Sequence, residues 1–294
     1  KDVYLWRKMK QQAMSTVELY DIYCEHPVVT TDSRNCLKGS MFFALKGASF
    51  DGNQYALQAL EKGCAYAVVD NPEVAKQDER ILLVDDVLTS LQDLAAHHRR
   101  VWGKTVLQIT GTNGKTTTKE LISAVLSEGM NVLFTEGNLN NHIGVPLTLL
   151  RIRPEHDIAV IETGANHPGE ITLLSNIVQA DFGLITNVGK AHLLGFGSFE
   201  GVKKTKGELY DYLRRTGDRV FLNVDNPHLC SMAAERNLQN DPERPYSLVI
   251  PYGLEYQQAK VLASSPEHPF LRVELDGRVI NTNLVGSYNA DNVM

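Results

Sequence analysis

The sequence predicts an α/β protein in which a small α/β domain precedes a larger domain built on a mostly parallel sheet, with an antiparallel β element at its end. Three observations predict this class. After Lys104, nearly continuous apolar runs alternate with amphipathic helical segments, as in parallel strands covered on both faces. A glycine-containing loop joins the first of these strands to a helix. Alternating polarity around Asp276-Gly277 indicates a two-residue hairpin.

The composition limits the classes of function. The 294 residues are 43% hydrophobic, which is enough for two domains with their own cores. A formal charge of −6 argues against a nucleic-acid partner. The cysteines lack paired metal spacing and resemble reduced thiols, and no apolar run approaches membrane-spanning length or forms a secretory signal. We therefore expect a cytoplasmic protein with no membrane insertion.

The first predicted domain covers residues 15–102 and ends at a hinge near Trp102-Gly103. Residues 1–14 are polar and lack an initiating methionine, so we expect an extension or a tag. Short apolar runs bounded by turn residues predict three strands, and 3.6-residue periodicity predicts two helices. The strands are Phe42–Leu45, Ala65–Val69 and Ile81–Val84, and the helices are Asn53–Lys62 and Val87–Arg100.

The second predicted domain covers residues 103–294, and the final Asn289–Met294 resembles the first turn of a helix, so we expect a truncated end. Four strands alternate with three helices. The predicted strands are Val106–Thr110, Ile158–Glu162, Gly183–Asn187 and Val220–Asn223, and the predicted helices are Thr116–Glu128, Gly169–Ile177 and Phe199–Leu213. Ligands of such sheets bind at the carboxyl ends of the strands, where the glycine loop, Glu162, Asn187 and His192 all lie.

The loop after the first strand of this domain predicts a nucleotide site. Gly111 and Gly114 lack a Cβ and allow a phosphate to approach the backbone, while Lys115 adds charge and Thr116 a hydroxyl for magnesium. Ile109 stands where the longer phosphate loop has its first glycine, so this is a shortened variant. A structural turn is the alternative, but the position between strand and helix favours phosphate binding.

Three further residues have both a functional and a structural interpretation. Glu162 at a strand end could reach a magnesium ion at the loop, or simply cap the next turn. His192 could be a ligand or a surface histidine. Lys206 lies on a helix with two other lysines, a pattern that normally indicates a solvated face. The residues alone leave these alternatives open.

The motifs together resemble the Mur ligase family, ATP-dependent enzymes that form amide bonds in peptidoglycan synthesis. The resemblance depends on Thr110–Thr117, Glu162 and the spacing from His192 to Lys206, and it covers the chain from about Ser15 to its end. Further matching segments are Thr31–Arg34, Phe42–Gly47, Asp51-Gly52, Thr135–Pro146, Gly164–Glu170 and Ala191–Ser198.

The resemblance implies a role for each matching position. The ATP-binding residues would be Gly111, Thr112, Asn113, Gly114, Lys115, Thr116 and Thr117, with Asn289 and Asn292 at the adenine side. Thr116 and Glu162 would hold one magnesium ion, and His192 and Lys206 the second, Lys206 often being carbamylated in the family. Lys115, His192 and Lys206 would be the catalytic residues. The substrate-binding residues would be Asp32, Ser33, Arg34 and Lys46 at the uridine nucleotide, and Asn138, Asn140 and Asn141 at the sugar–peptide part, although turn-forming asparagines remain the alternative for these three.

The implied activity is an ATP- and Mg²⁺-dependent joining of D-alanyl-D-alanine to UDP-N-acetylmuramoyl-tripeptide through an acyl phosphate, serving cell-wall biogenesis, by a monomer. The family's third, C-terminal domain has no counterpart in this sequence, so we expect weak or no turnover from these 294 residues alone. The alternatives are a sibling ligase that adds another amino acid, a P-loop kinase of a small metabolite, and a non-catalytic nucleotide-binding module.

Overall fold

The structure is a computed structural model that describes residues 12–189, 193–239 and 248–294. Its chain divides into two compact units. The first contains the residues up to Gly103 together with His142–Arg153, and the second contains Lys104–Asn141 and Pro154–Met294. In the described residues no helix is long and apolar enough to cross a membrane.

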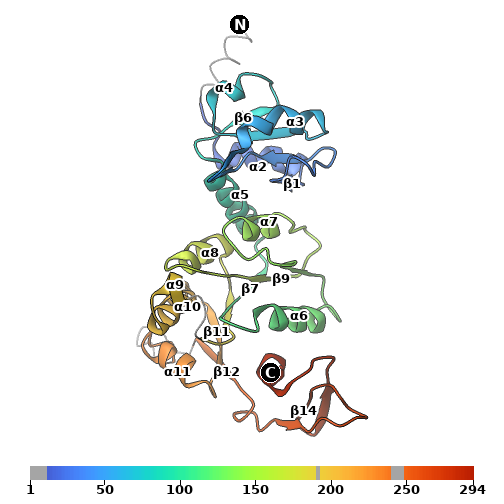
Figure 1. The fold of residues 1–294 in the computed structure, drawn as a ribbon, viewed down its shortest axis with the longest axis vertical. Coiled ribbons are helices and arrows are strands. Elements are labelled where there is room, and N and C mark those ends of the chain that lie inside the picture. Colours follow the sequence, from blue (N-terminus) through green and yellow to red (C-terminus); the bar gives the residue numbers. More distant parts are fainter. Residues whose placement is uncertain (1–11, 190–192, 240–247) are drawn as a thin grey trace. The chain divides into compact units, whose positions relative to one another are not determined.

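The first unit is built on a four-stranded parallel sheet of order β1-β2-β5-β6 (Figure 1). Its strands are β1 (Val29–Thr30), β2 (Met41–Phe43), β5 (Tyr66–Val69) and β6 (Ile81–Leu83), and a short hairpin joins β3 (Lys46–Gly47) to β4 (Phe50–Asp51). Its helices are α2 (Thr16–Glu25), η1 (Gly52–Tyr55), α3 (Ala56–Glu61), α4 (Pro72–Ala75), α5 (Val87–Trp102) and α7 (Gly144–Leu149). The predicted helix at 53–62 is therefore a 3₁₀ turn followed by α3.

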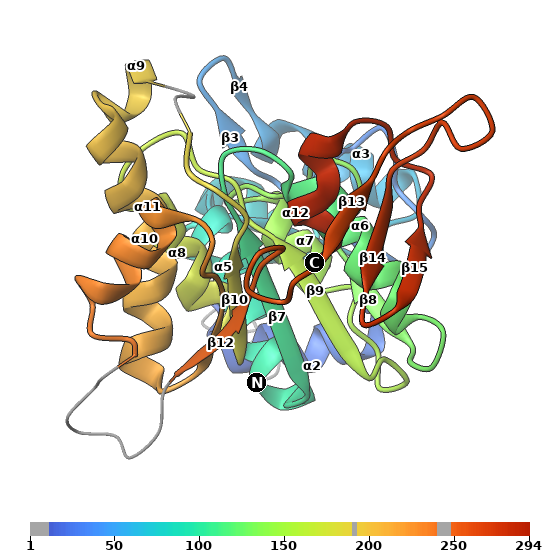
Figure 2. The ribbon, with the colours of Figure 1, turned by 90° about the horizontal axis from the view of Figure 1, so that it is seen from below.

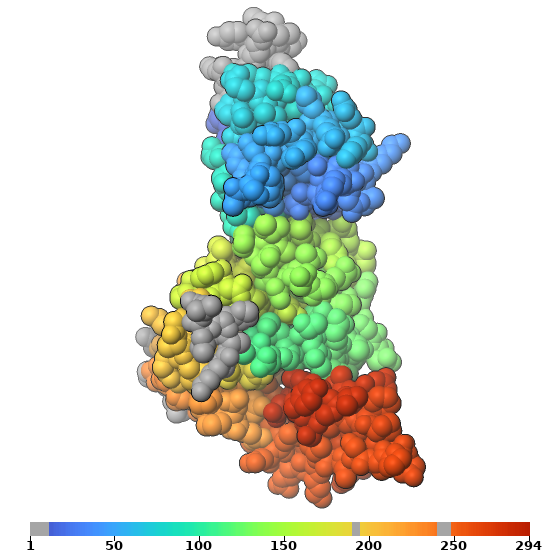
Figure 3. Space-filling view, in the orientation of Figure 1, coloured from blue at the N-terminus to red at the C-terminus, as the bar shows by residue number. Residues whose placement is uncertain are grey.

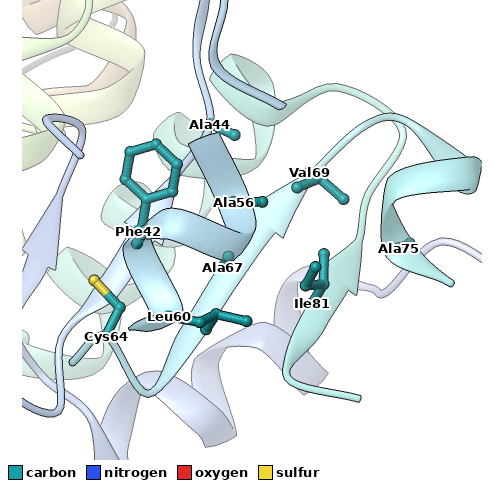
Figure 4. Packing of buried hydrophobic residues seen from close by; sticks show 10 residues of the cluster. Phe42, Ala44, Ala56, Leu60, Cys64, Ala67, Val69, Ala75 and Ile81 are labelled. Carbon is teal, nitrogen blue, oxygen red and sulfur yellow. The ribbon is translucent and has the colours of Figure 1, made fainter. Parts of the chain in front are cut away.

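One side of this sheet packs on α3 and α4 to form a small apolar core (Figure 4). Phe42, Leu60 and Ile81 are its larger side chains, and alanines fill the space between them, so the helix lies close to the strands. The candidate substrate residues follow two strands of this sheet, since Asp32, Ser33 and Arg34 come after β1 and Lys46 lies in the hairpin after β2.

The segment 142–153 joins the first unit, although the sequence suggested a single boundary near residue 103. Helix α7 packs against α5, and the Tyr23 hydroxyl donates a 2.6 Å hydrogen bond to the carbonyl oxygen of Leu150. Helix α7 is short and contains Gly144 and Pro146, so its sequence lacks the periodic apolar pattern that predicts a helix. The chain thus leaves the second unit after Asn141 and returns to it at Pro154.

The second unit contains a six-stranded sheet of order β12-β11-β10-β7-β9-β8 in which all pairs are parallel (Figure 2). Its strands are β7 (Thr105–Thr110), β8 (Val132–Phe134), β9 (Ile158–Glu162), β10 (Phe182–Ile185), β11 (Arg219–Asn223) and β12 (Val249–Tyr252). Its helices are α6 (Lys115–Leu126), α8 (Glu170–Val178), α9 (Leu193–Phe196), α10 (Phe199–Thr216) and α11 (Pro227–Ala234). The predicted parallel sheet is confirmed, and β8 and β12 are additional edge strands.

The side chains of β7 alternate between the two faces of the six-stranded sheet, and helices cover both faces. Leu107 and Ile109 pack with Ile122 of α6 on one face. Gln108 points to the other face, where its amide donates to the Ser175 hydroxyl of α8 at 3.0 Å. Because successive side chains of a strand alternate, α6 and α8 lie on opposite sides of the sheet (Figure 2).

The chain ends in a three-stranded antiparallel sheet of order β13-β14-β15, as the hairpin pattern predicted. Its strands are β13 (Lys260–Leu262), β14 (Arg272–Leu275) and β15 (Arg278–Asn281). Asp276 and Gly277 both have positive φ, of 51° and 73°, as the tight turn requires. The following η2 (Ser287–Asn289) and α12 (Ala290–Val293) bring the end of the chain against α6, where red and green surfaces meet in Figure 3.

Candidate nucleotide and metal site

The loop from Gly111 to Gly114 connects β7 to α6 and has positive φ at both glycines, 146° and 78°. A Cβ at Gly111 would lie 2.1 Å from the Thr186 hydroxyl oxygen, and one at Gly114 would lie 2.5 Å from the Asn292 side-chain oxygen. At both positions the sequence predicts a glycine because a phosphate approaches the backbone. In the structure, side chains of the protein itself already occupy both positions, so the loop excludes a Cβ without any ligand.

The beginning of α6 presents hydrogen-bond donors and positive charge. Gly114 is the N-cap and provides no side-chain cap. Within the described residues, the N–H groups of Gly114, Lys115, Thr116 and Thr117 make no hydrogen bond. The Lys115 ammonium donates to the carbonyl oxygen of Thr112 at 3.2 Å. Burial lowers the pKa of Lys115, while Glu162 acts in the opposite direction. Unpaired donors at a helix N-terminus are suited to phosphate oxygens.

The carboxylate of Glu162 lies beside this helix terminus and is only 1% exposed. The Thr116 hydroxyl donates to Glu162 Oε2 at 2.9 Å, and the Asn140 amide donates to Oε1 at 2.8 Å. Octahedral Mg²⁺ with ligands near 2.1 Å separates neighbouring ligand oxygens by about 3.0 Å. The two oxygens of Thr116 and Glu162 therefore fit adjacent positions around one magnesium ion.

The described residues contain no group of three His, Cys, Asp or Glu side chains that could hold a metal by themselves. Mg²⁺ at catalytic sites usually takes one or two protein oxygens and completes its shell with water and substrate phosphates. The Thr116–Glu162 pair beside a phosphate-binding helix terminus has this composition.

Lys206 lies on α10 and is 3% exposed, so the expected solvated lysine face does not include it. Its amine lies 5.7 Å from the centroid of the Phe196 ring and has no hydrogen-bond acceptor in the described part of the chain. Burial, with the charge of Lys115 as a smaller cause, lowers the pKa of Lys206 to about 8, although Glu170 and Glu208 oppose the shift. A large neutral fraction of this amine is therefore present at mildly alkaline pH.

Asn292 reaches the loop from the end of the chain, and Asn289 supports it. The Asn292 amide donates to the Asn289 side-chain oxygen at 2.9 Å, and the Thr118 hydroxyl donates to Asn292 Oδ1 at 3.3 Å. The Asn289 amide in turn donates to the carbonyl oxygen of Val285 at 2.9 Å. These contacts hold Asn292 at the beginning of α6, beside Gly114, and Asn289 is its hydrogen-bond partner.

The candidate substrate residues of the first unit form ion pairs of their own. Arg34 and Asp32 form a bidentate pair at 2.9 Å, which lowers the pKa of Asp32 to about 2. Lys62 donates to the carbonyl oxygen of Ser33 at 2.9 Å, and Lys46 pairs with Asp70 at 2.7 Å. Asp70 and Lys62 are thus polar partners that the sequence did not identify.

The other predicted positions differ in what the structure shows. Asn138 accepts a hydrogen bond at its carbonyl oxygen from the Asn140 N–H at 2.8 Å, and Asn141 follows in the same loop. His192 lies outside the described residues. Sequence reasoning missed Thr186, whose hydroxyl contacts the loop, because only its place beside β7 in the sheet order reveals it.

The parallel sheet, the loop and the acidic strand end define a nucleotide-binding domain of the P-loop type. Models of two protein families match the chain, "Mur ligase middle domain" over residues 109–294 and "Mur ligase family, catalytic domain" over residues 27–99. The chain belongs to the Mur ligase family.

Relatives and solved structures agree with this assignment. The chain is 44% identical over 198 residues to the UDP-N-acetylmuramoyl-tripeptide–D-alanyl-D-alanine ligase of Escherichia coli K12, covering 67% of this chain and 43% of the relative. It is 36% identical over 271 residues to the ligase of the same name from Haemophilus influenzae, and the alignment covers 90% of this chain and 57% of the relative. A crystal structure of MurF from Acinetobacter baumannii superposes with a TM-score of 0.77 at 31% identity, covering 90% and 57%. The structure of MurF ligase from Thermotoga maritima in complex with ADP superposes with a TM-score of 0.75 at 27% identity, covering 90% of this chain and 60% of that one. The chain spans about half the length of the curated relatives it matches.

Proposed function

We propose that this chain provides the ATP site and the uridine-nucleotide site of a ligase that joins D-alanyl-D-alanine to UDP-N-acetylmuramoyl-tripeptide. The observation that carries the proposal is the Thr116–Glu162 contact beside the unpaired N–H groups of α6. This arrangement suits a phosphate and a magnesium ion together. The names of the most similar relatives supply the substrates.

ATP is a substrate of this reaction, and the loop residues Gly111 to Thr117 would hold its phosphates. Lys115 would neutralise charge on the transferred phosphoryl group, and its partial burial strengthens that interaction. Asn289 and Asn292 would lie at the adenine side. Magnesium, when bound, would neutralise the charge that spreads over the phosphoryl oxygens.

Thr116 and Glu162 would hold one magnesium ion. Asn140 would orient the Glu162 carboxylate by its hydrogen bond to Oε1, the oxygen that Thr116 does not contact. Lys206 would serve a second ion together with His192. A neutral Lys206 amine can add to carbon dioxide, forming a carbamate and releasing one proton, and this converts a buried cation into an oxygen ligand. The lowered pKa of Lys206 favours the neutral amine that the addition needs.

The uridine-nucleotide end would contact Asp32, Ser33, Arg34 and Lys46, and the sugar–peptide part would contact Asn138 and Asn141. Asn140 would contact the sugar–peptide part and also orient Glu162, because its amide donates to the Glu162 carboxylate. The tripeptide carboxylate would take the γ-phosphoryl group of ATP, and the amine of the dipeptide would then displace phosphate. Carboxylate activation is needed because amide formation from a free carboxylate in water is unfavourable.

The test is ADP release by the intact protein with ATP, Mg²⁺ and UDP-N-acetylmuramoyl-tripeptide, with and without D-alanyl-D-alanine. We expect stoichiometric ADP release that requires both substrates. Equal release with a single amino acid in place of the dipeptide would identify a sibling ligase. A stable phosphorylated product without an amine would identify a kinase, and ATP binding without any substrate-dependent release would identify a non-catalytic module.

A further inference from the structure

We propose that Asn187 and Thr186 are positioning residues for the phosphate loop. They fix the peptide group of Asn113 so that the N–H groups from Gly114 to Thr117 face the nucleotide phosphates. The inference rests on the proposed ATP site and deepens it, because it states which loop amides bind phosphate and what directs them.

The two segments lie side by side because β10 is the sheet neighbour of β7, with Ile185 paired to Thr110. Beyond the strand ends the pairing continues. The Thr186 N–H donates to the carbonyl oxygen of Thr110 at 3.0 Å, and the Thr112 N–H donates to that of Asn187 at 3.0 Å. The residues after β10 therefore run alongside the loop and not away from it.

The side chains of Asn187 and Thr186 hydrogen-bond to the backbone N–H and carbonyl groups of Asn113. Its N–H donates to Asn187 Oδ1 at 3.1 Å, and its carbonyl oxygen accepts from Asn187 Nδ2 at 3.0 Å. The Thr186 hydroxyl donates to the same carbonyl oxygen at 2.6 Å. A carboxamide can pair with a peptide in both directions as a neighbouring strand does, whereas a carboxylate can only accept.

These contacts decide which loop amides remain for a ligand. The N–H groups of Thr112 and Asn113 are occupied by Asn187. In a trans peptide the C=O of one residue and the N–H of the next point in opposite directions. With the carbonyl of Asn113 held toward Thr186 and Asn187, the N–H of Gly114 points to the opposite side, where the N–H groups of the helix start are also unpaired among the described residues.

The glycine at 111 fits this arrangement. A Cβ there would lie 2.1 Å from the Thr186 hydroxyl oxygen, so the absence of a side chain is what admits the hydroxyl to Asn113. The loop is also shorter than the common phosphate loop, and it has fewer residues of its own with which to hold its shape. A partner from the neighbouring strand supplies that support.

The experiment uses the intact protein and four variants. Asn187→Asp keeps the acceptor, removes the donor and adds a negative charge, and Thr186→Val removes the hydroxyl without changing charge. Thr186→Ser keeps the hydroxyl and is the rescue variant. Asn226→Asp is the matched control, because Asn226 follows the adjacent strand β11 and uses only its side-chain oxygen, accepting from the N–H groups of His228 and Leu229. Thermal melting without nucleotide checks that each variant is folded.

Calorimetry measures binding of the Mg²⁺ complex of β,γ-methylene-ATP, and steady-state kinetics gives KM for ATP and for the uridine-nucleotide substrate. We expect Asn187→Asp and Thr186→Val each to weaken nucleotide binding about tenfold, as the loss of a hydrogen bond in a preorganised site predicts. The KM for the uridine nucleotide stays unchanged, Thr186→Ser restores most of the affinity, and Asn226→Asp binds as the wild type does.

The failures are distinguishable. A wild-type protein that binds no Mg²⁺–nucleotide complex would overturn the ATP site together with this inference. A wild type that binds while Asn187→Asp and Thr186→Val bind equally well would overturn only the inference. Equal losses in Thr186→Ser or Asn226→Asp would do the same, because a general disturbance of the sheet edge would then explain the effect.

Discussion

The Thr116 hydroxyl donates a 2.9 Å hydrogen bond to Glu162 Oε2, although 46 residues separate the two in the sequence. The sheet order explains the contact, because β9 is the direct neighbour of β7 and both strands end at the same edge. The spacing of the two oxygens suits a shared magnesium ion. Both oxygens would be available to it once the hydroxyl proton turns away from the carboxylate.

Glu162→Gln is therefore expected to raise the Mg²⁺ concentration required for ADP release. The substitution keeps the shape and one acceptor oxygen, turns the other acceptor into an NH2 donor, and removes the charge that attracts the cation. A tenfold or larger rise in the half-saturating Mg²⁺ concentration, measured at saturating ATP, is the expected result. Glu128→Gln, an exposed carboxylate beyond α6, serves as the control. An unchanged Mg²⁺ requirement in Glu162→Gln would remove Glu162 from the metal site.

The two loop glycines are expected to be needed for folding of the loop even when no nucleotide is present. Gly111→Ala and Gly114→Ala each place a methyl group against a protein side chain at positive φ, which costs about 2 kcal/mol or more. Gly129→Ala is the matched control, since nothing lies within 4 Å of its Cβ position and no positive φ is involved. Urea unfolding without ligand measures the effect. If only ATP binding changed, the phosphate and not the protein would explain the glycines.

The sequence predicted most of the second unit because its elements have strong local signals. The apolar runs of β7, β9 and β10 and the periodic helices between them are recognisable without tertiary information. The three-residue edge strand β8 is too short for such a signal, and α7 contains both a glycine and a proline. The strand order, which places the ends of β7, β9 and β10 together, depends on packing and not on any one segment.

The candidate site shows the same limit at the level of single residues. Glu162 could be selected as a strand-end acid, but the hydrogen bond from Asn140 could not, because its turn has no periodic pattern. The helical pattern alone does not distinguish Lys206 from its neighbouring lysines; the family resemblance selects it, and the structure shows that its side chain is buried. Which lysine of a helix is buried depends on how α10 packs against α8 and α9.

Lys119 offers a test of a buried charge that the sequence did not identify. Its side chain is 0% exposed, donates to the carbonyl oxygen of Thr135 and pairs with Glu120 at 2.7 Å. The Thr135 hydroxyl accepts from the Glu162 N–H at 2.9 Å, so Lys119 supports the strand end that carries Glu162. Lys119→Met is expected to lower the free energy of unfolding by about 1–3 kcal/mol, because it removes the ammonium donor of the buried Thr135 carbonyl oxygen.

Urea unfolding of Lys119→Met should be compared with that of Lys76→Met. Lys76 also pairs with a nearby glutamate, Glu73 at 2.6 Å, but lies at the surface. Its loss is expected to change the free energy of unfolding by less than about 0.5 kcal/mol. Equal effects of the two substitutions would show that the buried position of Lys119 contributes nothing particular.

Lys206 is expected to destabilise the folded protein while being needed for activity. Its pKa of about 8 in the folded state lies below the 10.5 of an unperturbed lysine, so between these values the unfolded chain binds more protons. Stability should therefore rise with pH across this window, and at pH 7 the folded state carries the full cost of a buried cation. Lys206→Met removes that cost. It should raise the free energy of unfolding at pH 7 by an amount on the order of 2 kcal/mol.

Urea unfolding in bicarbonate-free buffer at pH 7 and at pH 9.5 measures this difference, which should shrink as the pH rises because the wild-type amine becomes neutral in the folded state. The same substitution should abolish substrate-dependent ADP release. Lys204→Met on the same helix, at an exposed position, is the control and should change neither quantity. A gain in stability that does not vary with pH would instead reflect better packing of methionine, and it would remove the buried charge as the cause.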